Sequence, residues 1–198
     1  MKSELEWVSD QHLIRELIKR LGEDTNRQGL KETPDRVVKA WQFWTSGYKQ
    51  SVADVLKVFE DGGEEYDQLL FQANIPVFSF CEHHLAQMFG IAHVSYVPNG
   101  RIVGLSKLSK VVDIFARRLQ VQERMTKQIA NALMEHLQPK GVGVVMQLRH
   151  MCMESRGIQK VGTVTISSAL RGCIKDEPEC RAEFMSFVNT ASQGLVKL

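Results

Sequence analysis

Two short clusters of cysteine and histidine in this sequence could bind a metal. Cys81-Glu-His-His84 follows one strand-like run, and His150-Met-Cys152 ends another. A Cys-x-x-His spacing brings a thiolate and an imidazole to one side of a tight turn, a common arrangement for two ligands of one zinc. Cys152 is the natural third ligand. The sequence therefore predicts a zinc site formed by Cys81, His84 and Cys152.

Three protein ligands would leave the fourth tetrahedral position to water, as in catalytic zinc sites. Zinc lowers the pKa of such a water towards ~7, so the site would supply a nucleophile at neutral pH. The alternative is a closed structural site, with Cys173, Cys180, His83 or His150 as the fourth ligand. The spacing alone leaves both possibilities open.

Proton transfer is the chemistry expected of the remaining histidines of the two clusters, His83 and His150. Imidazole is the side chain best suited to exchange protons near neutral pH. Either residue could instead orient a metal ligand.

Basic residues that could bind an anion lie in separate segments. One group begins a predicted helix, where free backbone N–H groups would add to the positive charge. Each single residue could equally be an ordinary solvated charge. The sequence contains neither a Walker loop nor a G-x-G-x-x-G motif, which excludes those two modes of phosphate binding. The groups are Ser106, Lys107 and Lys110; Arg156 and Lys160; and Arg36 and Lys39.

The apolar pattern predicts the elements that must position these residues. Residues 1–60 have helical periodicity, 75–80 and 91–97 resemble strands, and Asn99-Gly100 predicts a hairpin to 101–105. Residues 106–138 predict two helices or one kinked helix, 142–148 and 161–166 strands, and 177–188 a closing helix. The order indicates an α+β fold with an antiparallel sheet. Residues 1–65 are expected to form a helical extension and residues 66–198 the main domain.

Composition excludes several classes of protein. The 198 residues are 43% hydrophobic and 24% charged, which is typical of a globular protein and not of a disordered chain or a collagen. The net charge of +2 provides no global attraction to nucleic acid, and no membrane span is expected. The N-terminus lacks a signal-peptide pattern, so we expect a reducing, cytoplasmic setting without a disulfide framework.

The sequence resembles the GTP cyclohydrolase type I family from about residue 10 to residue 188. The resemblance rests on Cys81-Glu-His-His-Leu85, Gly104-Leu-Ser-Lys-Leu108, Leu119-Gln-Val-Gln-Glu-Arg124, His150-Met-Cys-Met153, Arg156-Gly-Ile-Gln-Lys160, and Thr33-Pro-Asp-Arg36 with Lys39. It implies the tunnelling fold, in which an antiparallel sheet carries two long helices on one face and follows N-terminal helices. It also implies a homodecamer of two pentameric rings, with sites between subunits. The implied reaction converts GTP and water to 7,8-dihydroneopterin triphosphate and formate, the first step of folate or tetrahydrobiopterin synthesis.

The resemblance also implies a role for individual residues. Cys81, His84 and Cys152 match the ligands of one zinc per subunit, and His83 and His150 match acid–base histidines. The remaining matches are Ser106 near the ribose, Glu123 with its neighbour Gln122 at the guanine edge, and Arg36, Lys39, Lys107, Lys110 and Arg156 at the triphosphate.

Some positions depart from the family pattern. Lys110 stands where arginine is usual, which keeps the charge but loses the bidentate fork. Gln87-Met88, Gln147-Leu148 and Ile174 replace other common residues, and none of these changes removes a predicted ligand. Two alternative functions remain: a non-catalytic, zinc-stabilised ring that binds a nucleotide or pterin and regulates a partner, and a nitrile reductase of the same fold. Formate release from GTP distinguishes the enzyme from both.

Overall fold

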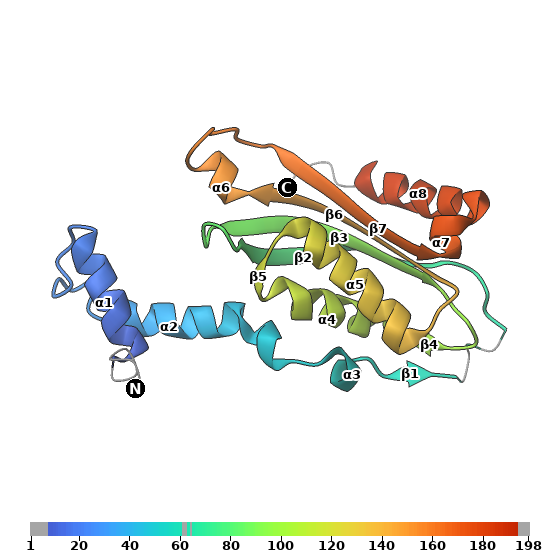
Figure 1. Ribbon diagram of the computed structural model, residues 1–198, viewed down its shortest axis with the longest axis horizontal. Helices are drawn as coiled ribbons and strands as arrows, with labels where there is room; N and C mark the ends of the chain where they lie inside the picture. Colours follow the sequence, from blue (N-terminus) through green and yellow to red (C-terminus); the bar gives the residue numbers. More distant parts are fainter. Residues whose placement is uncertain (1–7, 61–62, 64, 194–198) are drawn as a thin grey trace, which may run out of the picture. The chain divides into compact units, whose positions relative to one another are not determined.

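The computed structural model describes residues 8–60, 63 and 65–193 of the chain (Figure 1). Two compact units, one up to Ser46 and one from Gly47 onward, are described separately, and a division at residues 65/66 stays a prediction. The helices are α1 (Asp10–Arg20), α2 (Thr33–Trp44), the 3-10 helix η2 (Ser46–Lys49), α3 (Val52–Val55), α4 (Leu105–Ala116), α5 (Gln122–Leu137), α6 (Met151–Glu154), α7 (Cys173–Asp176) and α8 (Pro178–Gln193). The strands are β1 (Val58–Phe59), β2 (Leu70–Cys81), β3 (Gln87–Val97), β4 (Ile102–Val103), β5 (Leu119–Gln120), β6 (Gly141–His150) and β7 (Val164–Gly172). Among the helices so described, none is long and apolar enough to cross a membrane.

The N-terminal unit consists of α1, α2 and their connection. The Ser9 side chain caps α1 by accepting a hydrogen bond from the His12 N–H at 3.3 Å. Gly22, just beyond the end of α1, has φ of +93°, which glycine adopts without strain. Helix α2 begins at Thr33 with Glu32 at its N-cap position, and no side chain caps it. The Pro34 ring instead fixes the backbone of the first turn.

The second unit is built on a five-stranded sheet in the order β5-β2-β3-β6-β7. The four long strands pair antiparallel with their neighbours, and only the short β5 runs parallel to β2. A separate pair, β1 with β4, lies outside this sheet. The predicted α+β class is therefore confirmed.

The hairpin predicted at Asn99-Gly100 is wrong. Gly100 does turn the chain, with φ of +70°, but β4 pairs with β1 and not with β3. Strands β2 and β6 already pair with the two edges of β3, so neither edge is free to pair with the segment that follows it. A side chain makes the contact instead, because the Val103 N–H donates to the Tyr96 hydroxyl at 3.1 Å.

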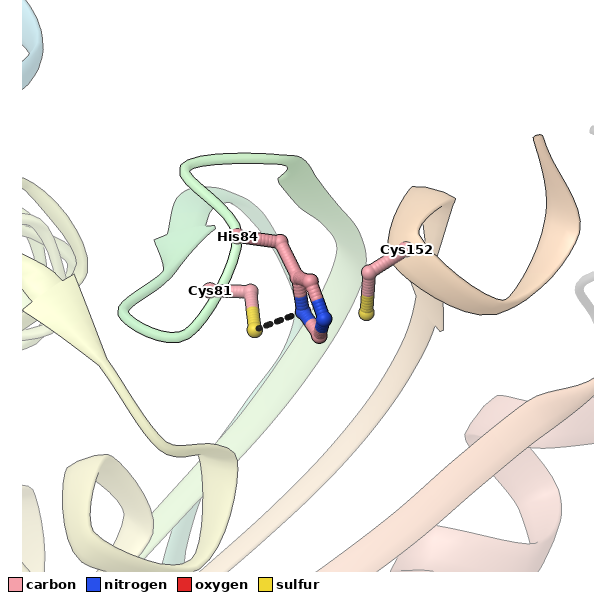
Figure 2. A group of neighbouring side chains, drawn as sticks. All are labelled: Cys81, His84 and Cys152. Atoms are coloured by element: carbon pink, nitrogen blue, oxygen red, sulfur yellow. Dashed lines mark hydrogen bonds between the residues drawn. The ribbon is translucent and has the colours of Figure 1, made fainter. Parts of the chain in front are cut away.

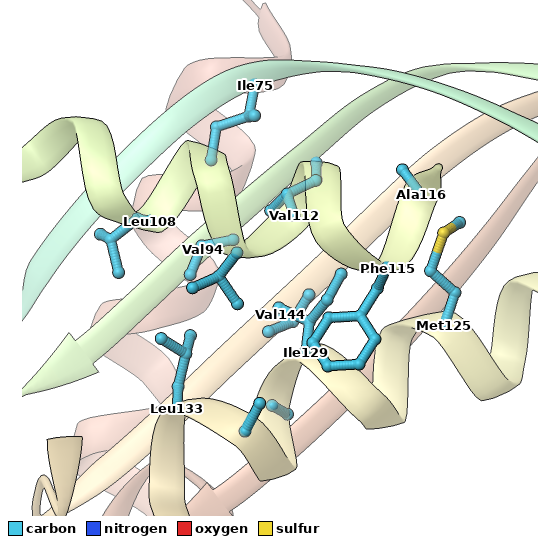
Figure 3. Close-up of a cluster of buried hydrophobic side chains, with 14 of the residues drawn as sticks. Ile75, Val94, Leu108, Val112, Phe115, Ala116, Met125, Ile129, Leu133 and Val144 are labelled. Atoms are coloured by element: carbon cyan, nitrogen blue, oxygen red, sulfur yellow. The ribbon is translucent and has the colours of Figure 1, made fainter. Parts of the chain in front are cut away.

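The main core lies between one face of the sheet and the two long helices α4 and α5 (Figure 3). Val94 and Val144 on the sheet meet Val112, Ile129 and Leu133 on the helices, and all five are fully buried. Each such side chain stabilises the fold by about 1.5–3 kcal/mol relative to its exposed state. The chain leaves α4 at Ala116, adds β5 to the sheet and enters α5 at Gln122, so residues 106–138 form two helices, the first of the two predicted alternatives. The arrangement expected for the tunnelling fold is confirmed.

The opposite face of the sheet is covered at one end by α8. Phe184 and Val188 of α8 pack against Val145, whose neighbours Val144 and Met146 face the main core. His93 is fully buried because the Phe71 ring of β2 stacks on it, with 5.7 Å between ring centres, and Phe71 in turn packs against Phe184 of α8. Burial lowers the pKa of His93, which favours the neutral imidazole beneath Phe71.

Candidate metal centre

Strand pairing brings both cysteine–histidine clusters to one end of the sheet. Met88 lies opposite His150 in the β3–β6 ladder, and Cys81 lies opposite Gln120 in the β2–β5 ladder. The β2–β3 turn, the end of β6 and the start of α5 therefore meet at the same place. Sequence separation alone could not show this, because Cys81 and His150 are joined only through the register of β3.

The turn after β2 directs His84 back over Cys81. The Cys81 N–H donates to the Ala86 carbonyl at 2.8 Å, and the Leu85 N–H donates to the Cys81 carbonyl at 2.9 Å. Leu85 takes the left-handed conformation, with φ of 53°, which tightens the turn. As a result the Nδ1 atom of His84 lies 3.7 Å from the Sγ atom of Cys81.

Cys152 completes the group from the opposite side. It lies on α6, which begins directly after β6, and its thiol points towards Cys81 and His84 (Figure 2). One ligand atom from each residue lies within 4.8 Å of the other two. Ligands of a tetrahedral zinc with Zn–S bonds of ~2.3 Å are about 3.8 Å apart. Two thiols and one imidazole at these separations fit a zinc ion with only small side-chain movements.

The protonation state of Cys152 would depend on a bound cation. Burial and the neighbouring Cys81 thiol raise the pKa of the Cys152 thiol, whereas Arg156 lowers it. Without a cation the group therefore prefers the neutral thiol. A divalent metal favours the thiolate, and its binding releases the proton.

Two of the alternative fourth ligands are excluded within this chain. Cys173 and Cys180 contact each other, with 3.3 Å between their Sγ atoms. Cys173 follows Gly172, which pairs with Gly141 at the start of β6, whereas Cys152 follows the end of that strand. Nine residues of strand at ~3.3 Å per residue place the two cysteine groups about 30 Å apart.

His83 is the more exposed of the two candidate proton-transfer residues. Its Nδ1 atom lies 3.8 Å from the Cys81 Sγ atom, and its Nε2 atom lies 3.9 Å from the Glu82 carboxylate. Glu82 is paired with Arg124 of α5, and this pairing lowers the pKa of the Glu82 carboxyl group. His83 thus stands beside the metal ligands, next to a carboxylate that remains ionised.

His150 is oriented by Gln122. The Gln122 amide nitrogen donates to the Thr165 carbonyl and to the Ser167 hydroxyl, both at 3.0 Å. Its Oε1 atom is therefore the acceptor that lies 2.7 Å from His150 Nε2, so His150 donates through Nε2 and keeps the Nδ1 lone pair. Burial lowers the pKa of His150, and Glu123 partly opposes this shift.

Sequence reasoning missed this orienting contact. Gln122 is 1% exposed, and both ends of its amide are hydrogen-bonded within the chain. A direct contact between Gln122 and substrate stays a prediction. Its neighbour Glu123 is exposed in the first turn of α5. No short sequence pattern predicts the contact between Gln122 and His150, because Gln122 lies on α5 and its partners lie on β6 and β7.

The predicted phosphate-binding residues are not all brought to this end of the sheet. Arg156 lies in the loop after α6 and acts electrostatically on Cys152. Ser106, Lys107 and Lys110 lie on α4, where the neighbouring Ser109 hydroxyl accepts a hydrogen bond from the Gln72 amide at 3.0 Å. Gln72 lies nine residues before Cys81 along β2, a separation of about 30 Å at ~3.3 Å per residue. Arg36 and Lys39 are exposed on α2 of the N-terminal unit.

Comparison with known proteins agrees with this site. The family model of GTP cyclohydrolase I matches residues 10–189. GTP cyclohydrolase 1 of Nitrosospira multiformis is 57% identical over 174 residues, which cover 88% of this chain and 91% of that protein. GTP cyclohydrolase 1 of a Janthinobacterium species is 60% identical over 171 residues, 86% of each chain. The same enzyme of Campylobacter curvus is 48% identical over 187 residues, 93% of this chain and 97% of that one. The chain therefore belongs to the GTP cyclohydrolase I family of enzymes.

Proposed function

We propose that the protein is a zinc-dependent hydrolase that converts GTP and water to 7,8-dihydroneopterin triphosphate and formate. The observation that carries the proposal is the convergence of Cys81, His84 and Cys152 within 4.8 Å. His83 and His150 flank this group, so a nucleophile and proton-transfer groups would share one place. When bound, zinc supplies an activated water nucleophile at neutral pH, which opening an imidazole ring requires.

The histidines would move the protons of the reaction. Gln122 fixes the His150 ring, so that its Nδ1 lone pair is available to accept a proton. His83 is exposed and can exchange protons with both substrate and solvent. Ring opening, loss of formate, rearrangement of the ribose and ring closure are hydrolytic or proton-transfer steps. They need acids and bases but no redox cofactor.

Glu123 is the proposed determinant of base specificity. Its carboxylate, in the first turn of α5, would accept hydrogen bonds from the N1–H and 2-amino groups of guanine. Adenine lacks this pair of donors, and a carboxylate left unpaired in a closed site is costly. ATP is therefore expected to be a poor substrate.

The test is to incubate the purified protein with GTP, and separately with ATP, and to measure formate and the ultraviolet spectrum of the product. Formate and a pterin spectrum from GTP alone support the proposal. A protein that carries zinc and yet releases no formate from GTP contradicts it.

We further infer that the complete site lies between subunits of a homo-oligomer. One GTP molecule cannot reach both Cys152 and the basic residues of α4 in the same chain, because these lie about 30 Å apart. The sheet also has an apolar surface on its edge strand β7, where Val164 and Ile166 are 49% and 65% exposed. Phe78 on β2 is 66% exposed. Contact between the sheets of neighbouring subunits would cover these residues, and two stacked pentamers are the assembly expected from the family resemblance.

A subunit-mixing experiment tests this inference. We expect Lys107→Glu and Cys152→Ala each to inactivate the protein, because one removes a phosphate contact and the other a ligand. Co-expression of equal amounts should restore about one quarter of wild-type activity, since random assembly gives one site in four with both halves intact. Mixing Cys152→Ala with His84→Ala is the matched control and should restore nothing, because both changes affect the same half. An absence of recovery in the first mixture would place the whole site in one chain.

A further inference from the structure

The loop 155–163, between α6 and β7, has few anchors to the rest of the unit. Its side chains are exposed throughout, so none of them is held by the core. Three of its residues, Gly157, Gln159 and Gly162, take the left-handed conformation. Near its end, the Lys160 N–H donates to the Met153 carbonyl at 3.1 Å. The position of this loop must therefore depend on a small number of polar contacts.

The Glu154 carboxylate makes the most extensive of these contacts. The Glu154 side chain is only 3% exposed, and its Oε2 atom accepts a hydrogen bond from the Gly162 N–H at 3.1 Å. Arg149 at the end of β6 donates to both carboxylate oxygens, at 2.8 and 2.5 Å. The Arg149 guanidinium in turn lies 5.3 Å from the centre of the Phe89 ring on β3. Glu154 thus ties the far end of the loop to the sheet through a bidentate ion pair.

The Glu154 side chain is 3% exposed and forms a bidentate, charge-assisted pair with the Arg149 guanidinium. Replacement by glutamine keeps the shape of the side chain but removes this charge.

The loop also carries a cation close to the candidate metal centre. Arg156 follows Cys152 by four residues, and a Cβ on its neighbour Gly157 would lie 4.0 Å from the Cys152 carbonyl oxygen, so the backbone of Arg156 lies beside the ligand segment. Arg156 lies between Glu154, where the loop begins, and Gly162, which Glu154 binds. A shift of Gly162 would consequently change the position of Arg156.

We propose that Glu154 is a positioning residue, which holds loop 155–163 so that Arg156 meets the phosphate groups of the substrate. This inference rests on the proposed function for the identity of that substrate. Glu154 does not touch the substrate. It acts through Gly162 and the loop backbone, with Arg149 as its support.

The Glu154→Gln variant tests the proposal. We expect the KM for GTP to rise about tenfold, the loss expected when a charge-assisted hydrogen bond is removed, while kcat stays within about twofold of wild type. Inhibition by inorganic tripolyphosphate, which carries no base or sugar, should weaken by a similar factor. The effect should disappear in an Arg156→Ala background, because the cation that Glu154 positions is then absent. Exchange of the Gly162 amide hydrogen should become faster.

The controls separate this role from a general loss of structure. Glu23→Gln disrupts an exposed ion pair with Arg27 in the N-terminal unit and should leave the kinetics unchanged. Zinc content and melting temperature should stay near wild type in Glu154→Gln. If that variant does not fold, Arg149→Lys keeps the charge, loses the fork, and should raise KM in the same way.

Other outcomes overturn the proposal. One is unchanged tripolyphosphate inhibition in Glu154→Gln. Another is a loss of activity that follows loss of zinc, since Glu154 would then support Cys152 rather than the loop. If the wild-type protein releases no formate, the proposed function fails. Calorimetric binding of tripolyphosphate to wild type and Glu154→Gln then still tests the role of Glu154.

Discussion

Replacing Cys152 by alanine is expected to abolish both zinc binding and turnover. Cys152 supplies one of the three ligand atoms that lie within 4.8 Å of one another, and it alone comes from the β6 side of the group. The two remaining ligands would leave a metal bound weakly, because removing even an indirect partner of a zinc ligand costs 10–100-fold in affinity or activity, and loss of a ligand costs more. Zinc per chain, measured by atomic emission after dialysis, should fall to near zero, and formate release should fall by more than about a hundredfold.

Cys180→Ala is the matched control for this prediction. Cys180 is half-buried, contacts Cys173 at the other end of the sheet, and has no part in the ligand group. The control variant should keep its zinc and its activity. Full activity in Cys152→Ala would rule out the assigned ligand set, whatever its zinc content.

Replacing His83 by alanine is expected to leave zinc in place but to abolish ring opening. The His83 ring lies beside Cys81 and Glu82 and is exposed to solvent. Positioned acid–base groups contribute about 10²–10⁴-fold to a rate, and we expect kcat to fall by this factor. The measurement is formate release together with zinc content. His12→Ala, an exposed histidine on α1, is the control and should behave like wild type.

The two readouts distinguish the possible roles of His83. Loss of turnover with zinc retained is the result expected of a proton-transfer residue. Loss of zinc in His83→Ala would instead identify this residue as a ligand. Normal formate release by the variant would remove its proposed catalytic role.

The sequence predicts the ligand group well because its spacing is local. Cys81 and His84 are joined by one turn, and the His150-Met-Cys152 segment is equally short. The same local reasoning predicts helices and strands, since each carries its own apolar period. It does not predict which strand meets which. The register that places Met88 opposite His150 and the stacking of Phe71 on His93 both depend on the whole sheet.

Long-range pairing also explains where the predictions were wrong or incomplete. Asn99-Gly100 is a strong hairpin signal, but β3 already has two partners and leaves no edge for β4. The hydrogen bonds from His150 to Gln122 and from Gly162 to Glu154 link residues that no motif connects. The sequence of one chain also does not show which residues meet across a subunit interface, and the proposed role of Lys107 needs a second subunit.

The measurement that tests the central claim most directly is formate released from GTP, in one preparation, before and after its metal is removed and zinc is restored. We predict formate in equal amount to GTP consumed, together with a pterin spectrum, loss of both after chelation, and recovery of both with zinc. No formate from protein that carries one zinc per chain would contradict the account, as would formate release that chelation leaves unchanged.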